Sequence, residues 1–234
     1  MSMKILFRDI PQIVQGNFTE NNFIETDSTD GNIQCRLRIH LQGNKPVIDG
    51  CRLFLPASTK GNIILHLGGD HSQVTFGENT SCTIDLRLWR ESNIYIGQNT
   101  TCNGARVITD NSDVFIGEDC MFSDEVLIQS NDQHGLIDLD SQTLINAGRR
   151  SIVIGDHVWL GRRSTLMPDI RVGKGSVVGS GAVVVKDVEP FCYAAGVPAR
   201  TVRERSSWTR DPIAPSPGEI AFFSASGFPM KETA

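Results

Sequence analysis

One stretch of the chain repeats every six residues without interruption. From Ile154 onward it reads IGDHVW, LGRRST, LMPDIR, VGKGSV, VGSGAV and VVKDVE. A period of six matches neither the 3.6-residue period of an α-helix nor the two-residue alternation of a simple strand. It predicts short strands joined by tight corners, with glycine at corner positions and one aliphatic residue per six pointing inward. The predicted inward residues are Ile154, Leu160, Leu166, Val172, Val178 and Val184, and the mostly small fifth positions are Val158, Ser164, Ile170, Ser176, Ala182 and Val188.

The same phrase appears earlier in a weaker form, ending at Gly77, Gly97 and Gly117, which are 20 residues apart. Each segment reads as one coil of three hexapeptides with two extra residues at a corner, and stacked coils would pair their strands in parallel about 4.8 Å apart. The spacing of six predicts these inward triplets: Phe76, Cys82 and Leu88; Ile96, Cys102 and Ile108; Ile116, Phe122 and Ile128. Cys82 and Cys102 fall on inward positions and Cys120 on a small fifth position, which favours buried structural thiols.

Several protein classes are disfavoured by composition. No run of about 20 apolar residues suggests a membrane span, and the first 15 residues, with Lys4, Arg8 and Asp9, do not form a signal peptide. We therefore expect a cytoplasmic protein with free thiols. The six cysteines form no CxxC pair. A net charge of −5 gives no general attraction to nucleic acid.

The charge is distributed unevenly along the chain. Residues 154–205 carry eight basic and five acidic side chains, a net of +3, although the whole chain is at −5. A positive segment in an acidic protein suggests a locally held anionic ligand, and a solvated basic face explains the charge almost equally well.

The repeat also divides the chain. We expect an N-terminal cap over residues 1–45, a β-helix over 46–205 and an irregular, proline-rich tail over 206–234. Inside the helix the pattern lapses over a loop, 129–151, that carries Asp132, His134 and Asp138. A stacked coil does not need such an insertion, and functional groups concentrate on loops of rigid scaffolds.

Two side chains stand out as candidates for chemistry. Histidine is suited to proton transfer near neutral pH, and the place of His134 in the loop, directly before the strongest repeats, sets it apart from the other four histidines. Trp159 occupies a sixth position, where the side chain should point outward. An outward tryptophan marks either a contact site or packing under the loop or against another subunit.

The hexapeptides resemble those of the left-handed parallel β-helix acyltransferases. The phrases IGDHVWLG from Ile154, VGSGAVVVKDV from Val178 and AGVPAR from Ala195 are similar to the sugar O-acetyltransferase branch, which includes galactoside, maltose, nodulation-factor and capsular polysaccharide acetyltransferases. The resemblance covers roughly residues 96–205, and the segment SNDQH from Ser130 is most similar to enzymes that act on bacterial surface glycans. It implies an all-β fold, acetyl-CoA as co-substrate, no metal and a homotrimer with sites between subunits.

The resemblance also assigns roles to residues. His134 matches the catalytic base, Trp159 the aromatic residue of the acetyl and pantetheine channel, and Asn103 an asparagine near the reacting centre. Asn111 takes the place of an acidic acceptor contact, for which the neighbouring Asp110 could substitute. Positions assigned to coenzyme A contacts are Gly161, Arg162, Ser180, Val185 and Lys186, and Arg200 and Arg203 match residues that meet the nucleotide phosphates.

These assignments predict direct acetyl transfer to a sugar hydroxyl of a bacterial surface polysaccharide or its precursor. His134 would act as general base, oriented by Asp132 or Asp138, and a backbone N–H near Gly161 or the Asn103 side chain would stabilise the oxyanion. Three alternatives stay open: N-acetylation of a nucleotide-linked amino sugar, a zinc-dependent carbonic anhydrase with His66 and His71 as ligands, and a non-catalytic scaffold.

Overall fold

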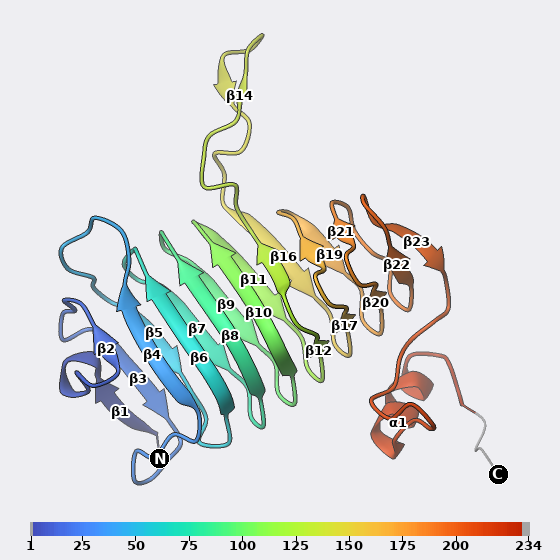
Figure 1. Ribbon diagram of the computed structural model, residues 1–234, viewed down its shortest axis with the longest axis horizontal. Coiled ribbons are helices and arrows are strands. Elements are labelled where there is room, and N and C mark those ends of the chain that lie inside the picture. Colours follow the sequence, from blue (N-terminus) through green and yellow to red (C-terminus); the bar gives the residue numbers. More distant parts are fainter. Residues whose placement is uncertain (1, 231–234) are drawn as a thin grey trace.

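The structure, a computed structural model, describes residues 2–230. Short strands wind into one long β-helix, with the N-terminal strands at one end, the C-terminal helix near the other and an arm projecting from the side (Figure 1). One sheet contains β1 (Met3–Leu6), β3 (Phe23–Thr26), β5 (Arg52–Phe54), β7 (Gln73–Phe76), β9 (Asn93–Ile96), β11 (Ser112–Ile116), β16 (Arg150–Ile154) and β19 (Ile170–Val172).

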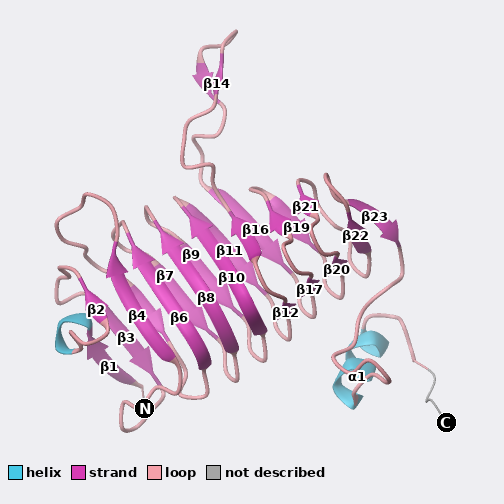
Figure 2. Ribbon diagram, in the orientation of Figure 1, coloured by secondary structure: helices cyan, strands magenta, loops and turns pink. Residues whose placement is uncertain are grey.

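The second sheet bends round a corner and supplies two faces of the coil. β10 pairs with β12 along its first part and with β13 along its second part. The strands of this sheet are β2 (Val14–Gln15), β4 (Arg36–Leu41), β6 (Lys60–Leu67), β8 (Ser81–Leu88), β10 (Thr101–Thr109), β12 (Met121–Phe122), β13 (Val126–Gln129), β17 (Trp159–Leu160), β18 (Thr165–Leu166), β20 (Val177–Val178), β21 (Val183–Val184), β22 (Tyr193–Ala195) and β23 (Arg200–Arg203). The other described elements are β14 (Ile137–Asp138), β15 (Thr143–Leu144), a 3-10 turn (Phe7–Asp9) and α1 (Pro217–Ala225), and Figure 2 shows how strands dominate.

The core is a set of stacked aliphatic columns, as the six-residue period predicts. All six first positions from Ile154 to Val184 are at most 1% exposed, and the fifth positions are buried too. Phe122 lies beside Leu160 and Leu160 beside Val178 in successive parallel strands. Each coil thus buries its apolar residues against the coil before and the coil after it, as in other solenoids.

One predicted inward residue is wrong. Eight of the nine residues in the earlier triplets are buried, whereas Ile108 is half-exposed and Val107 takes the inward place. The cause is an irregularity in β10: Cys102 pairs with Cys82, but Ala105 pairs with Ile84, so β10 carries one extra residue. Because side chains alternate along a strand, that residue reverses the direction of every side chain after it.

The glycines of the repeat are required for a reason other than the predicted corner geometry. None of the glycines at 77, 97, 117, 155, 161, 173 and 179 has positive φ; residues two positions further on, such as Asn99 and Asp119, have φ of 59° and 52°. A Cβ on Gly117 would lie 2.6 Å from the backbone nitrogen of Asp156 in the next coil. Glycine is therefore required there because successive coils approach each other too closely for a side chain.

The cysteines are structural, as predicted. Cys82, Cys102 and Cys120 are at most 4% exposed, and all six thiols are free. Burial raises the pKa of the Cys102 and Cys120 thiols to about 12, so both stay protonated and unreactive at neutral pH.

Both ends of the chain differ from the predicted division into cap, β-helix and tail. β3 runs parallel to β5 and β4 parallel to β6, so the coils begin well before residue 46. The tail is not irregular throughout, because α1 forms within it. Ser216 caps this helix: its hydroxyl accepts from the Glu219 backbone N–H, and the Glu219 carboxylate accepts from the Ser216 backbone N–H.

The predicted loop forms an arm, defined here as residues 131–149, that stands away from the coils (Figure 1). Its outer part is a small antiparallel hairpin of β14 and β15. Its apolar side chains are solvent-exposed, by 50 to 85%: Leu136, Ile137, Leu139, Leu144 and Ile145. Among the described residues, no helix has the length and apolarity that a membrane crossing requires.

Candidate functional site

His134 stands at the base of the arm, where Asn146 fixes the backbone around it. The Asn146 side-chain nitrogen donates to the carbonyl of His134 at 2.8 Å, and its oxygen accepts from the Leu136 backbone N–H at 2.8 Å. Asn146 is only 7% exposed. One buried amide on the returning side of the arm therefore holds the backbone from His134 to Leu136 on the outgoing side. The sequence gives no local signal for this role, because Asn146 and His134 are 12 residues apart.

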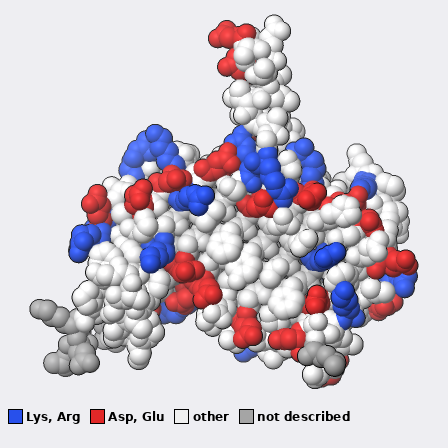
Figure 3. Space-filling model, turned by 180° about the vertical axis from the view of Figure 1, so that it is seen from behind, with Lys and Arg blue, Asp and Glu red and all other residues white. Residues whose placement is uncertain are grey.

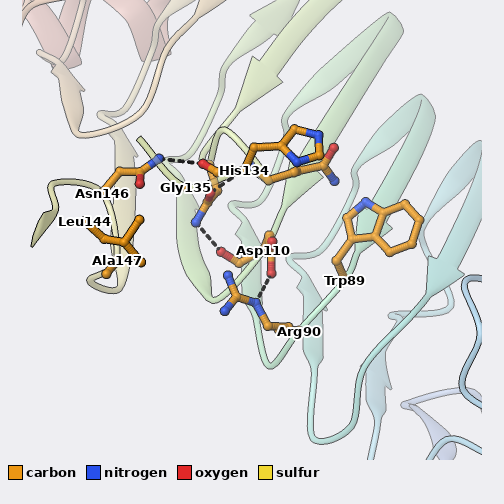
Figure 4. Close-up of a pocket in the computed structure, with 10 residues that line it drawn as sticks. Trp89, Arg90, Asp110, His134, Gly135, Leu144, Asn146 and Ala147 are labelled. Carbon is orange, nitrogen blue, oxygen red and sulfur yellow. Dashed lines mark hydrogen bonds and ion pairs between the residues drawn. The ribbon is translucent and has the colours of Figure 1, made fainter. Parts of the chain in front are cut away.

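A cavity of about 650 Å³ opens beside His134 (Figure 4). The arm supplies one wall of this cavity, and the corners of the two preceding coils supply the other. Its lining residues are Trp89, Arg90, Asp110, Asn131, Gln133, His134, Gly135, Leu144, Asn146 and Ala147. We call it the arm cavity. It combines apolar, aromatic, amide and charged groups, which is the mixture that binds small polar molecules.

Asp110 lies in the arm cavity, as its predicted role requires. Its carboxylate is 9% exposed and pairs with the Arg90 guanidinium. Its backbone carbonyl accepts from the Asn131 side chain at 2.7 Å. Asn111 turns a corner with φ of 48°, and its side-chain oxygen accepts from Arg149 at 3.4 Å. Asn103 is exposed at the irregular part of β10 and does not line this cavity.

The two carboxylates expected to orient the His134 imidazole have other partners. Asp132 accepts from the Asn146 side chain at 3.2 Å. Asp138 accepts from the backbone N–H groups of Asp140 and Ser141 in the turn between β14 and β15. These turn hydrogen bonds lower the pKa of the Asp138 carboxyl. In residues 2–230 neither carboxylate forms a hydrogen bond to the imidazole, so their predicted role has no support within one chain.

Trp159 lies in a second cavity of about 770 Å³, on another side of the coil. Four residues predicted to contact the cofactor line it together: Trp159, Gly161, Ser180 and Arg203. The indole N–H of Trp159 donates to the Ser123 hydroxyl at 3.2 Å, which fixes the ring at the cavity wall. We call this cavity the tail groove, because residues 205–209 and Pro212 of the C-terminal segment form its other wall.

The remaining predicted cofactor residues lie outside the lining of the tail groove. Arg162 pairs with Asp124 at 2.7 Å, Arg200 donates to the neighbouring Ala199 carbonyl, and Val185 and Lys186 are exposed. The Gly161 backbone N–H donates to the Val178 carbonyl at 2.7 Å. Because that donor is used by the strand ladder, a backbone N–H that stabilises an oxyanion near Gly161 would have to come from another residue.

Sequence analysis missed the part of the tail that completes the groove. The Trp208 ring stacks on His157 with centroids 4.4 Å apart, its indole N–H donates to the His157 carbonyl, and the His157 ring contacts the Trp208 carbonyl at 3.0 Å. Trp208 lies 6.3 Å from the Trp159 ring. These partners are 51 residues apart, so no local pattern predicts the contact.

The tail is anchored by a charge cluster around Asp119, which gives it a pH dependence. Arg210 donates to Asp119, to the Thr101 hydroxyl and to the carbonyls of Asn99 and Cys120. Burial raises the pKa of the Asp119 carboxyl, but hydrogen bonds from His157 and Arg210 outweigh burial and bring it below its ordinary 3.8. A lowered carboxyl pKa adds stability that is present above about pH 4 and lost as the pH falls through the folded-state value.

We therefore expect the tail to detach below about pH 4 while the coils stay folded. Limited proteolysis with an acid-active protease should cut between residues 204 and 216 as the pH falls from 5 to 3. The Asp119→Asn variant, which keeps a hydrogen-bonding side chain but cannot ionise, should lack this transition. Equal cleavage of both proteins at every pH would contradict the role of Asp119.

The arm cavity and the tail groove share no lining residue. His134 follows the strand β13, whereas Trp159 begins β17 on a different face of the coil. Within one chain, the predicted base and the predicted cofactor channel therefore do not form one site.

The histidines proposed as zinc ligands are not brought into one cluster. His66 stacks on His40 with centroids 5.1 Å apart and lies 3.5 Å from Asp85, on the outer face of β6. His71 is at a corner beside Gly50. No group of three or more metal-ligating side chains occurs among the residues that the structure describes.

Comparison with known proteins identifies the repeat. Residues 151–186 match the family described as bacterial transferase hexapeptide (six repeats). A chloramphenicol acetyltransferase of Escherichia coli is 49% identical over 55 residues, which are 24% of this chain and 26% of that protein. The polysialic acid O-acetyltransferase of Escherichia coli O1:K1 is 32% identical over 92 residues, 39% of this chain and 30% of that protein. The matched segments thus span less than a third of these relatives.

The structural comparison extends over much more of the chain. The crystal structure of the polySia-specific acetyltransferase NeuO matches with a TM-score of 0.75 and 28% identity, covering 92% of this chain and 94% of that one. Because residues 151–186 are a small part of that coverage, the likeness is not confined to the repeat. The chain therefore contains the hexapeptide repeat of the bacterial transferases and is similar, over most of its length, to the β-helix of an acetyltransferase.

Proposed function

We propose that the protein is an acetyl-CoA-dependent O-acetyltransferase that acetylates a hydroxyl of a sugar in a bacterial surface polysaccharide or its precursor. The observation that carries this proposal is the exposed His134 imidazole in the arm cavity, at the point where the arm leaves a β-helix similar to that of an acetyltransferase. Named relatives include O-acetyltransferases of polysialic acid and of galactosides, which supports a glycan as acceptor.

The reaction proposed is direct transfer. The His134 imidazole takes the proton of the sugar hydroxyl as its oxygen attacks the thioester carbonyl. The C–S bond then breaks, and the imidazolium returns the proton to the departing thiolate, so the products are an acetyl ester and free coenzyme A. General-base assistance of this kind contributes about 10²- to 10⁴-fold.

The tail groove supports a binding site for the donor. It is aromatic at Trp159 and Trp208, has a floor of small residues at Gly161 and Gly179, and carries Arg203 and Arg205. A long ligand with an uncharged amide arm and a phosphorylated end, such as acetyl-CoA, matches this combination of aromatic, small and basic groups. Two of the eight basic residues of 154–205, Arg203 and Arg205, would lie beside the phosphorylated end of such a ligand. Because acetyl-CoA is a cytoplasmic metabolite, the proposal places the reaction in the cytoplasm.

We infer further that the active unit is a homotrimer with each site shared by two chains. Two features support this. His134 and Trp159 line separate cavities within one chain, and the arm exposes apolar side chains such as Leu139, which is 85% exposed. A second chain that covers the arm would bury these side chains and could bring its own tail groove to His134.

The test is release of free thiol from acetyl-CoA in the presence of a panel of acceptors. The panel contains neutral and acidic oligosaccharides together with nucleotide-linked amino sugars. Acceptor-dependent release with an ester product, which hydroxylamine cleaves, is expected for an oligosaccharide. Release only with the amino sugars and a hydroxylamine-stable product would replace this proposal by N-acetylation. Coenzyme A binding without release on any acceptor would favour a non-catalytic scaffold.

A further inference from the structure

Two residues of the arm cavity have no role in the proposal so far. Trp89 and Arg90 follow β8 directly and form a corner of the coil one turn before Asp110 and two turns before Asn131. Figure 4 shows the indole and the guanidinium on the side of the cavity opposite Leu144 and Asn146. Because the coils stack, residues about 20 positions apart in sequence meet at this corner.

The Trp89 side chain is half-buried, and two glycines leave room for its ring. A Cβ on Gly68 would lie 3.0 Å from the ring, and a Cβ on Gly43 would lie 3.3 Å from it. The absence of side chains at these two positions lets the indole settle close to the coil surface. The Trp89 backbone N–H donates to the Thr109 carbonyl, which fixes the base of the side chain. An aromatic ring that packs against the coil on one face and opens to a cavity on the other is suited to stacking against the ring of a ligand.

Arg90 is oriented by a buried partner but keeps its outer nitrogens available. The Asp110 carboxylate, 9% exposed, pairs with Nε of Arg90. No hydrogen bond within residues 2–230 uses the two terminal nitrogens of Arg90, and its side chain is 64% exposed. The fork formed by these two nitrogens matches the two oxygens of a carboxylate. Figure 3 shows further basic side chains at the foot of the arm, with acidic ones between them.

The place of this corner along the helix separates acceptor from donor. Trp89 and Arg90 belong to coils that precede the arm, whereas every residue lining the tail groove comes after it. His134 stands between these two parts of the chain. An acceptor that stacks on Trp89 would thus lie on the N-terminal side of the base, away from the coils that form the tail groove of each chain.

We propose that Trp89 and Arg90 form the acceptor subsite and that it takes an acidic sugar, with the ring on the Trp89 indole and the carboxylate on the Arg90 fork. This rests on the proposed function for the role of His134. The assignment of the subsite itself concerns binding only, so it can be tested without acetyl transfer.

The experiment measures binding of two matched pairs of probes to the intact protein by calorimetry without acetyl-CoA. The probes are short oligomers of sialic acid and of galacturonic acid, each beside its carboxyl-reduced form. Wild type should bind at least one acidic oligomer about 10- to 100-fold more tightly than its reduced form, the range of a charge-assisted hydrogen-bond pair. The Arg90→Gln variant should lose this preference, and Trp89→Ala should weaken both forms roughly tenfold.

Two further variants keep the test interpretable. Arg90→Gln leaves the buried Asp110 carboxylate without its partner, so the double variant Arg90→Gln with Asp110→Asn removes both charges together. Arg163→Gln is the matched control, because Arg163 also pairs with an acidic residue, Glu125, away from the arm cavity. The control should bind like wild type.

Three results would overturn the subsite: wild type binds neither acidic oligomer, binds acidic and reduced forms equally, or the preference survives in the double variant. Failure of the proposed function would give a different result from failure of the subsite. A preference that depends on Arg90, found together with no thiol release on any acceptor, would keep the subsite and reject the transferase. Thiol release on an acidic acceptor at a rate that Arg90→Gln leaves unchanged would keep the transferase and reject the subsite.

Discussion

Replacing His134 with alanine should lower kcat for acetyl transfer by about 10²- to 10⁴-fold, the range that general-base assistance supplies. The physical reason is that no other group in the described part of the arm cavity can take a proton from a hydroxyl as readily near neutral pH. Asp110, the acidic residue of its lining, is paired with Arg90. The KM for acetyl-CoA should change little, since His134 is absent from the lining of the tail groove.

The measurement is thiol release at saturating acceptor, with circular dichroism to check the fold. His40→Ala is a suitable control, because His40 is a histidine that lies on β4, away from both cavities. Loss of activity in His134→Ala with normal activity in the control is the expected result. An unchanged kcat in His134→Ala would remove this residue from the reaction and leave the transferase to another base.

Mixing two inactive variants should restore activity if each site is shared between chains. We expect His134→Ala to lack the base and Trp159→Ala to lack a wall of the donor groove, so each alone should have little activity. In trimers assembled at random from equal amounts, about a quarter of the sites would combine an intact His134 from one chain with an intact Trp159 from its neighbour. Activity should therefore rise from near zero to about a quarter of the wild-type value.

The two variants can be expressed together with different affinity tags, and the mixed trimers purified through both tags. Each mixed trimer contains one intact site of three, so the purified assembly should have about a third of the wild-type activity. The control is a mixture of His134→Ala with a second variant on the same side of the site, Asn146→Ala, in which neither chain retains an intact arm cavity. That mixture should stay inactive. A mixture of His134→Ala and Trp159→Ala that also stays inactive, although mixed assemblies form, would show that both residues act within one chain.

The stacked core could be predicted from the sequence because a period of six residues directly encodes which side chain points inward. The error at Ile108 shows the limit of that rule, since one extra residue in β10 reverses the alternation without any change in the surrounding letters. His134 could be singled out because it interrupts a regular pattern. Its neighbours Trp89 and Arg90 could not, because only the stacking of coils brings residues 45 positions away to the same corner.

The structure of the tail could not be predicted from the sequence for a related reason. Pro212 lies in a bend and Pro217 begins α1, and the attachment of the tail depends on His157, Asp119 and Arg210, which meet only in three dimensions. The capping box of α1, Ser216 with Glu219, is the one local signal that could have been found. A helix of nine residues with so little periodicity is stabilised mainly by what it packs against.

The arm interrupts the chain but not the stack. Ser112–Ile116 and Arg150–Ile154 pair residue for residue, in the same register as the uninterrupted coils, although the whole arm lies between them. The conformation of the chain between Asn131 and Arg149 therefore has no effect on how these two strands pair. For the history of such proteins this means that a corner of the coil can gain, lose or exchange a loop at almost no cost to folding. Substitutions that alter the walls of the arm cavity can then accumulate independently of those that preserve the columns beneath it.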